Sequence, residues 1–134
     1  MRNIKDIEGI GEAYAAKLNA CGITTTAQLL DRCATAKGRK DLAAESGISD
    51  ALILKWANRA DLDRIKGIGE EYSDLLELAG VDTVPELAQR NAANLLQKMT
   101  AVNADKDAVR RLPTESQVAG WIAEAKTLPR KLEY

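Results

Sequence analysis

The chain has 134 residues, enough for one compact domain or two small halves packed together. It carries 19 Lys and Arg against 20 Asp and Glu, which gives a net charge of −1. A general nucleic-acid binder is usually basic and is attracted as a whole to the phosphates, and this chain lacks that attraction. Because His is absent and only Cys21 and Cys33 are present, a Ser-His-Asp triad is excluded and a closed zinc site is disfavoured.

The first half of the chain predicts helices separated by small or polar residues. The expected segments are a short helix at 2–8, a turn at 8–11, helices at 12–21, 25–33 and 39–46, and a helix capped by Ser49 that reaches Ala60. Thr25 and Gln28 form a capping box, in which each side chain satisfies one backbone N–H of the first turn. Residues 34–38 are small and are expected to form a loop. Trp56 lies on the apolar stripe of the last helix and is expected in the core.

The second half predicts a similar order of elements. The expected segments are a short helix at 62–66, a helix at 70–79, a helix capped by Thr83, a helix capped by Asn91 that reaches Met99, a polar loop at 102–112, and a last helix from Pro113 to Ala125. Thr83 with Glu86 repeats the capping box, and residues 129–134 are expected to form a charged C-terminal tail. No segment alternates with period two, so the sequence predicts an all-α fold.

Two stretches of the chain repeat each other without a gap. Residues 7–30 and 65–88 are identical at ten of 24 aligned positions. The identical pairs are Ile7/Ile65, Gly9/Gly67, Ile10/Ile68, Gly11/Gly69, Glu12/Glu70, Tyr14/Tyr72, Leu18/Leu76, Gly22/Gly80, Thr25/Thr83 and Leu29/Leu87. We therefore expect one repeat at 1–64 and a second at 65–128.

Each copy places Gly-Ile-Gly before an apolar stripe at helical spacing, which is typical of a tight turn that opens a helix. The glycines permit positive φ and a close backbone approach. Gly22 and Gly80 lie where a left-handed C-terminal cap belongs. Tyr14 and Tyr72 follow each turn and are expected to pack at the start of the helix.

The pattern apolar-x-Gly-apolar-Gly at residues 7–11 and 65–69 resembles the helix-hairpin-helix motif. In that family the hairpin amides and the following helix N-terminus bind a DNA phosphate without reading sequence. The physical basis is an anion site made of unpaired amides and the positive end of a helix dipole. Two hairpins in register imply tandem helix-hairpin-helix repeats packed as one compact helical domain.

A second resemblance covers nearly the whole chain. The runs 38–43, 56–62, 71–72 and 87–91 are similar to the bacterial and archaeal domain-of-unknown-function 4332 family, which groups with helix-hairpin-helix proteins. That family has no assigned biochemistry. The resemblance therefore supports the fold and leaves the function open.

Our first hypothesis is a non-catalytic module that binds duplex DNA weakly and without sequence preference. The expected contacts are the backbone amides of both turns and nearby basic side chains: Gly9, Ile10, Gly11, Glu12, Gly67, Ile68, Gly69 and Glu70, with Lys17, Arg39, Lys40 and Lys66. Such binding depends on Lys and Arg contacts with phosphates and weakens with salt. No catalytic residue, metal or cofactor is expected.

The alternative hypothesis is a protein-interaction or scaffold module that keeps this fold and has lost phosphate binding. Glu12, Glu70 and Glu71 follow the second glycine, where the family pattern usually carries basic or neutral residues. A carboxylate there competes for the amides that a phosphate would use. The partner would then be another protein or a second copy of this chain.

Cys21 lies on the apolar face of its expected helix and is predicted to be a buried, free thiol. Cys33 ends the next helix, and a disulfide between the two stays open as an alternative. No apolar segment near the N-terminus has the length of a signal peptide or a membrane span. We therefore expect a cytoplasmic protein with no membrane partner.

Overall fold

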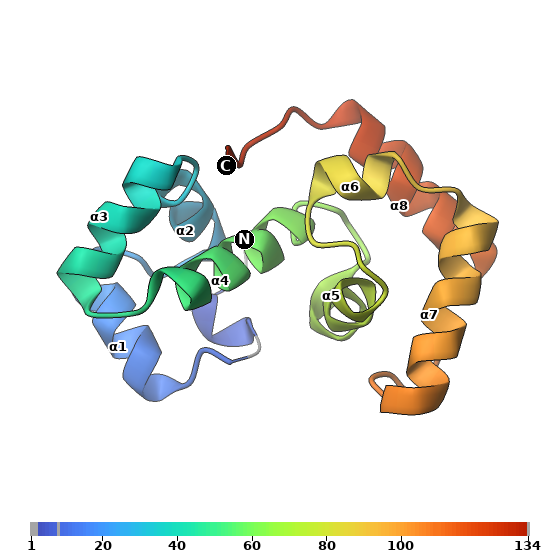
Figure 1. Cartoon of the computed structure of the whole chain (residues 1–134), viewed down its shortest axis with the longest axis horizontal. Coiled ribbons are helices and arrows are strands. Elements are labelled where there is room, and N and C mark those ends of the chain that lie inside the picture. Colours follow the sequence, from blue (N-terminus) through green and yellow to red (C-terminus); the bar gives the residue numbers. More distant parts are fainter. Residues whose placement is uncertain (1–2, 8, 134) are drawn as a thin grey trace. The chain divides into compact units, whose positions relative to one another are not determined.

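A computed structural model describes residues 3–7 and 9–133, apart from the side chains of residues 69–71 (Figure 1). This described part of the chain contains eight α-helices, one 3-10 helix and no named strand, so the all-α prediction is confirmed. Internal contacts divide the chain into two compact units, Met1–Asp61 with Arg130–Tyr134 (unit 1) and Leu62–Pro129 (unit 2). The sequence had placed the boundary after residue 64 and residues 129–134 in a tail.

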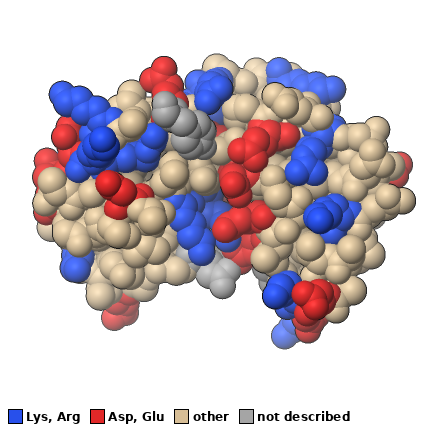
Figure 2. Space-filling view, in the orientation of Figure 1, with Lys and Arg blue, Asp and Glu red and all other residues tan. Residues whose placement is uncertain are grey.

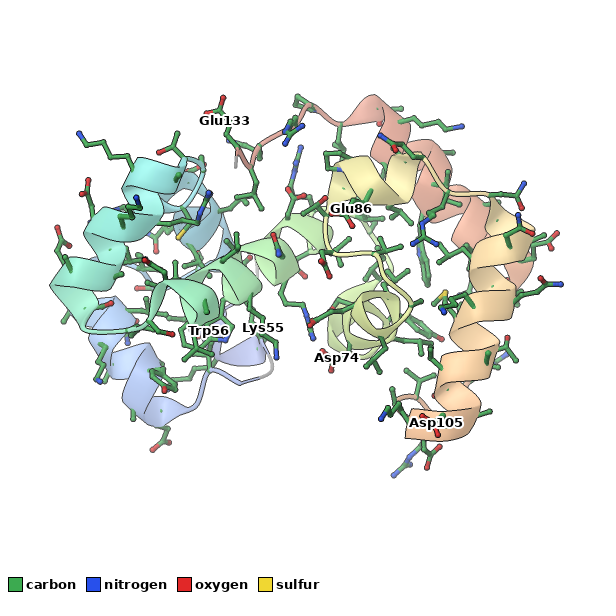
Figure 3. All side chains as sticks on the ribbon, in the orientation of Figure 1. Lys55, Trp56, Asp74, Glu86, Asp105 and Glu133 are labelled. Carbon is green, nitrogen blue, oxygen red and sulfur yellow. The ribbon has the colours of Figure 1, made fainter. Side chains whose placement is uncertain are left out.

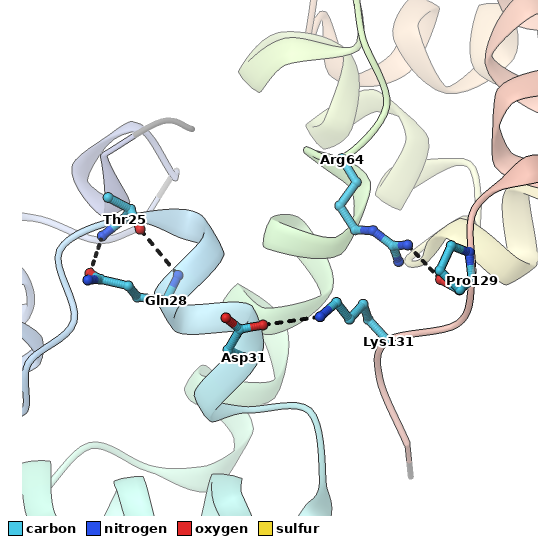
Figure 4. Close-up of polar contacts among 6 residues, drawn as sticks. All are labelled: Thr25, Gln28, Asp31, Arg64, Pro129 and Lys131. Atoms are coloured by element: carbon cyan, nitrogen blue, oxygen red, sulfur yellow. Dashed lines mark hydrogen bonds and ion pairs between the residues drawn. The ribbon is translucent and has the colours of Figure 1, made fainter.

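Unit 1 is built from a 3-10 helix and four α-helices. They are η1 (Ile4–Asp6), α1 (Glu12–Ala20), α2 (Thr26–Arg32), α3 (Ala36–Ser46) and α4 (Asp50–Leu62). Helix α1 packs on η1 and α3, and α2 packs on α3. The predicted capping box of α2 is confirmed, with Gln28 N 3.2 Å from Thr25 Oγ1 and Thr25 N 3.1 Å from Gln28 Oε1 (Figure 4).

The expected loop at 34–38 is wrong, because α3 already begins at Ala36. Thr35 caps this helix, and its hydroxyl accepts a hydrogen bond from Gly38 N at 3.0 Å. A Cβ at Gly38 would collide with the carbonyl oxygen of Arg32. Gly38 therefore allows the start of α3 to approach the end of α2 closely, and it does not mark a loop.

Unit 2 is built from four α-helices. They are α5 (Gly69–Leu78), α6 (Val84–Ala88), α7 (Ala92–Lys106) and α8 (Glu115–Thr127). Helices α6 and α7 pack on α8, and α5 packs on α7. The cap at Asn91 and the capping box of Thr114 with Gln117 are confirmed. The box expected at Thr83 is incomplete, because the Thr83 hydroxyl donates to the Glu86 carboxylate at 3.4 Å and makes no side-chain cap bond.

Two further expectations in the second half are wrong. The short helix at 62–66 does not form, because α4 runs to Leu62 and residues 63–68 are turns and a bend. The loop expected at 102–112 is shorter, because α7 continues to Lys106 and ends at Asp107, which has a left-handed backbone with φ 51°. The Asn103 side chain then pairs with the backbone of Val109, at 2.9 and 3.2 Å. The polar side chain of Asn103 therefore holds the loop that follows α7 against the end of that helix.

The last residues of the chain complete the core of unit 1. Leu132 is only 2% exposed and belongs to the same apolar cluster as η1, α1 and α4 residues. Glu133 N donates to Ala34 O at 2.7 Å, and Lys131 Nζ lies 3.2 Å from Asp31 Oδ1 (Figure 4). Residues 131–133 are therefore part of a folded unit.

The two cysteines are free thiols with different surroundings. Cys21 is only half-buried, whereas Cys33 at the end of α2 is fully buried. Burial raises the pKa of the Cys33 thiol from 9.0 to about 11, because the core disfavours the thiolate.

We predict that Cys33 resists thiol reagents in the folded protein and makes stability fall at high pH. Its folded pKa exceeds its unfolded pKa, so its contribution is full below pH 9 and is lost as pH rises towards 11. Ellman's reagent at pH 8 should modify Cys21 quickly and Cys33 only on unfolding. Urea melts should show a loss of about 2 kcal/mol by pH 11 that shrinks in Cys33→Ala. Equal reaction of both thiols in the native state would contradict the prediction.

Candidate nucleic-acid interface at the two glycine turns

The first turn rests directly on a tryptophan. Gly9 has a φ of +93°, and a Cβ added to it would lie 3.4 Å from Trp56 Nε1. Tyr14 packs edge-on against the same indole, with ring centroids 5.1 Å apart. Figure 3 shows Trp56 reaching from α4 towards α1. The core role predicted for Trp56 and the packing role predicted for Tyr14 are confirmed, and together they fix the turn.

The second turn has the same arrangement. Gly67 has a φ of +87°, and a Cβ there would lie 3.5 Å from Trp121 Nε1. Tyr72 packs against this indole with ring centroids 5.3 Å apart. Trp121 is seven residues beyond the position that the sequence repeat gives to the second Trp, yet it occupies the equivalent place. The structural repeat therefore extends further than the sequence alignment.

The helices that follow the two turns also end alike. Gly22 and Gly80 have φ values of 84° and 92° at the predicted left-handed caps. Ile23 N donates to Leu18 O at 2.9 Å, and Val81 N donates to Leu76 O at 2.8 Å. This six-to-one bond is the mark of a Schellman cap. Each unit thus contains a positive-φ glycine turn and a helix with a Schellman cap, whereas the helix starts differ: the N-cap of α1 is Gly11 in extended backbone and that of α5 is Ile68 in helical backbone.

The first turn presents a helix N-terminus without a side-chain cap. Gly11 is the N-cap of α1, makes no side-chain cap bond, and has open space where a Cβ would stand. Ile10 is buried, and its N–H already donates to Ile7 O at 3.1 Å, so the amide expected at Ile10 is taken within the turn. Glu12 is exposed in the first turn of the helix, and Lys17 Nζ lies 5.8 Å from the Tyr14 ring centroid. The start of α1 therefore has no side-chain cap at Gly11, and one lysine lies on the same helix.

The second turn already carries a carboxylate. Lys66 N donates to Glu124 Oε2, an atom of α8, at 3.3 Å. The Lys66 side chain is exposed and Ile68 is buried, whereas the Glu70 side chain lies outside the described residues. An acidic side chain thus sits beside the backbone of this turn, where it would repel a phosphate.

Sequence reasoning missed Glu124 because it lies 58 residues from Lys66. A signal did exist in the two tryptophans. Glu124 follows Trp121 by three residues, and the residue three after Trp56 is Arg59. When the repeats are aligned on these indoles, the residue three after the tryptophan is therefore of opposite charge in the two copies.

The structure removes Arg39 from the expected interface. Arg39 is only 7% exposed, and its Nη1 donates to the carbonyl oxygen of Cys33 at 2.9 Å. It thus ties α3 to the end of α2 and is not offered to a phosphate. Lys40, the next residue, is exposed on α3.

A different pair of arginines is held near the helix of the second turn. The Tyr72 hydroxyl donates to Arg111 O at 3.1 Å, which fastens the loop after α7 to α5. Arg110 and Arg111 are both exposed. The sequence showed them only as a local basic cluster, and their link to α5 depends on a tertiary contact.

Charge on the visible surface is mixed. Figure 2 shows acidic and basic side chains interspersed over both units on the face drawn. Among the residues that the structure describes, no group of three or more His, Cys, Asp and Glu side chains could hold a metal ion. Within the same described part, none of the helices is both long and apolar enough to cross a bilayer.

Comparison with known proteins identifies the family. The profile described as a domain of unknown function (DUF4332) matches residues 8–128. The chain belongs to this family. No curated protein and no solved structure matches the chain. The DUF4332 match spans both turns and both Tyr-Trp pairs, and its description assigns no activity.

We predict that Gly67→Ala destabilises this DUF4332 protein by about 1–2 kcal/mol, because a Cβ is strained at a φ of +87°. Gly120→Ala is the matched control in the same unit. Gly120 lies in α8 with open space around it, so alanine should stabilise the helix by roughly 0.5–1 kcal/mol. Urea denaturation of both variants measures the difference. Equal effects of the same sign would contradict the role of the turn.

Proposed function

We propose that this DUF4332 protein is a non-catalytic module of two helix-hairpin-helix repeats that binds duplex DNA weakly and without sequence preference. The observation that carries the proposal is the uncapped start of α1 at Gly11, which follows a turn of fixed backbone conformation. In this proposal the first hairpin binds phosphate more strongly than the second, because the Glu124 carboxylate beside the second turn repels a phosphate.

The chemistry of the first hairpin fits a phosphate oxygen. The first amides of an α-helix have no partner within the helix, and the dipole places positive potential at that end. Gly11 keeps the approach open, since it adds no side chain. Lys17 supplies one positive charge on the same helix. Only backbone and phosphate take part, so no base sequence is read.

The weakness of the binding follows from charge. Non-specific affinity for DNA grows with the number of Lys and Arg contacts to phosphates. The net charge is −1, Arg39 is buried, and Glu12 faces solvent beside the amides. Few phosphates are therefore neutralised. We expect a dissociation constant near the weak end of the usual non-specific range, about 10⁻⁴ M at physiological salt.

One observation favours the alternative function of a protein-interaction module. The Lys66 amide is already satisfied by the Glu124 carboxylate, so the second turn is complete without a ligand. Under that alternative, both glycine turns have a structural role only, and they are held in place by Trp56 and Trp121. The two proposals differ in their response to salt and to substitution at Gly11.

We predict that the protein binds a labelled random-sequence duplex in fluorescence anisotropy, and that Gly11→Asp weakens the binding about tenfold. Asp is a favoured N-cap, so its carboxylate should occupy the α1 amides and also keep or raise stability. Gly11→Asn is the matched control, because it caps without charge and should weaken binding less. Affinity should fall with salt by a slope of roughly −0.9 per phosphate contacted.

No binding by the wild-type chain at low salt would reject DNA binding and turn the search to protein partners. Binding that Gly11→Asp leaves intact would place the contact elsewhere on the surface. Gly11 suits this test better than Gly9, since a side chain at Gly9 would strain the backbone and confuse binding with folding.

We predict that Glu124→Gln raises affinity for the duplex about threefold and makes its salt dependence steeper. The change removes the charge beside the Lys66 amide and keeps the size of the side chain. Glu115→Gln, on the same helix, changes the net charge equally and is the control. A gain of the same size in both variants would show a general charge effect and no specific role for Glu124.

A further inference from the structure

Unit 1 is completed by residues that are distant in sequence. The rest of this unit is Met1–Asp61, and the segment Arg130–Tyr134 returns to it after the whole of unit 2. Leu132 is the apolar anchor, at 2% exposure among the core residues of unit 1. A small leucine-sized site in unit 1 is therefore filled by the C-terminal segment.

Polar contacts fix the direction of this segment. Glu133 N donates to Ala34 O at 2.7 Å, and Lys131 Nζ meets Asp31 Oδ1 at 3.2 Å. Arg130 Nε donates to Leu132 O at 2.8 Å, which shapes the segment itself. Unit 1 thus holds residues 131–133 by one apolar side chain, one backbone N–H and one lysine.

The chain leaves unit 2 at a defined point just before this segment. Arg64 Nη2 donates to the carbonyl oxygen of Pro129 at 2.5 Å, so Pro129 is held by unit 2 (Figure 4). Arg130 already belongs to unit 1. The passage between the units at this end is therefore a single peptide link, and the contacts described for residues 131–133 are with residues of unit 1.

We propose that the C-terminal segment 130–134 is exchangeable, and that a second copy of this chain inserts its own segment into unit 1. Every contact of Lys131, Leu132 and Glu133 is the same whether the segment comes from the same chain or from another. A swap of an identical element costs little free energy, because only the link between the units changes. The reciprocal exchange gives a closed dimer, whatever the hairpins bind.

The Lys131–Asp31 pair provides a test whose positive result is a heterodimer of two charge-reversed variants. In Asp31→Lys the pair becomes two lysines, and in Lys131→Asp it becomes two aspartates, so each variant alone repels its own segment. In a reciprocal heterodimer of the two variants, both pairs are again of opposite charge. Mixing the variants after brief urea treatment and refolding should give about ten times more dimer than either variant alone, by size-exclusion chromatography with light scattering.

The doubly substituted chain Asp31→Lys/Lys131→Asp is the control, since its pair is restored within one chain and mixing should not enrich the dimer. Adding Leu132→Asp to both partners should abolish the heterodimer. A mixture with no more dimer than its components would overturn the proposal.

The unmodified protein gives a second measurement that does not depend on the folding of any variant. Light and isotopically heavy wild-type chains are mixed, refolded and examined by native mass spectrometry at rising concentration. The measurement is made under reductant, so that no disulfide of Cys21 or Cys33 can link two chains. A dimer of one light and one heavy chain, with a mass between those of the two pure dimers, supports exchange. Monomers alone at every concentration would also overturn the proposal.

Discussion

The packing of an indole under a glycine turn determines the geometry of both units. Trp56 and Trp121 lie in contact with the positions where Gly9 and Gly67 would carry a Cβ, and a tyrosine from the following helix covers the same ring. The positive φ of each glycine turns the backbone onto the indole. The direction of α1 and α5 is set by this contact, and so is the direction in which their first amides point. Any anion site at these helix starts depends on the tryptophan beneath.

The same frame carries two different electrostatic environments. At the first turn, Gly11 leaves the start of α1 without a side-chain cap. The residue three after Trp56 in the sequence is Arg59, a base where the second copy has an acid. Beside the second turn, the equivalent position is Glu124, which accepts the Lys66 N–H. The positive-φ turns and the helix C-terminal caps repeat because the glycines and the aromatic residues repeat. Function need not repeat with it, because one side chain on α8 changes the charge next to the turn.

The sequence predicted those parts of the structure that depend on local interactions. Apolar periodicity located the helices, and the pairs Thr25–Gln28 and Thr114–Gln117 marked two helix starts correctly, since a capping box is closed within four residues. It failed where a polar residue has a distant or unexpected partner. Asn103 was assigned to a loop because its bond to Val109 is not visible in a helical pattern. Arg39 was placed on the surface because charge usually indicates exposure, whereas its guanidinium satisfies the end of α2.

The return of the chain to unit 1 has a consequence for synthesis. A ribosome adds residues from the N-terminus, and domains generally begin to fold as they emerge. Unit 2 is continuous in sequence, so all of its residues are available before the segment that follows Pro129 is made. Unit 1 must wait for Leu132, and its contact between Lys131 and Asp31 spans 100 residues. The half of the protein that is made first is therefore the half whose core closes last, once residues 130–133 have been made.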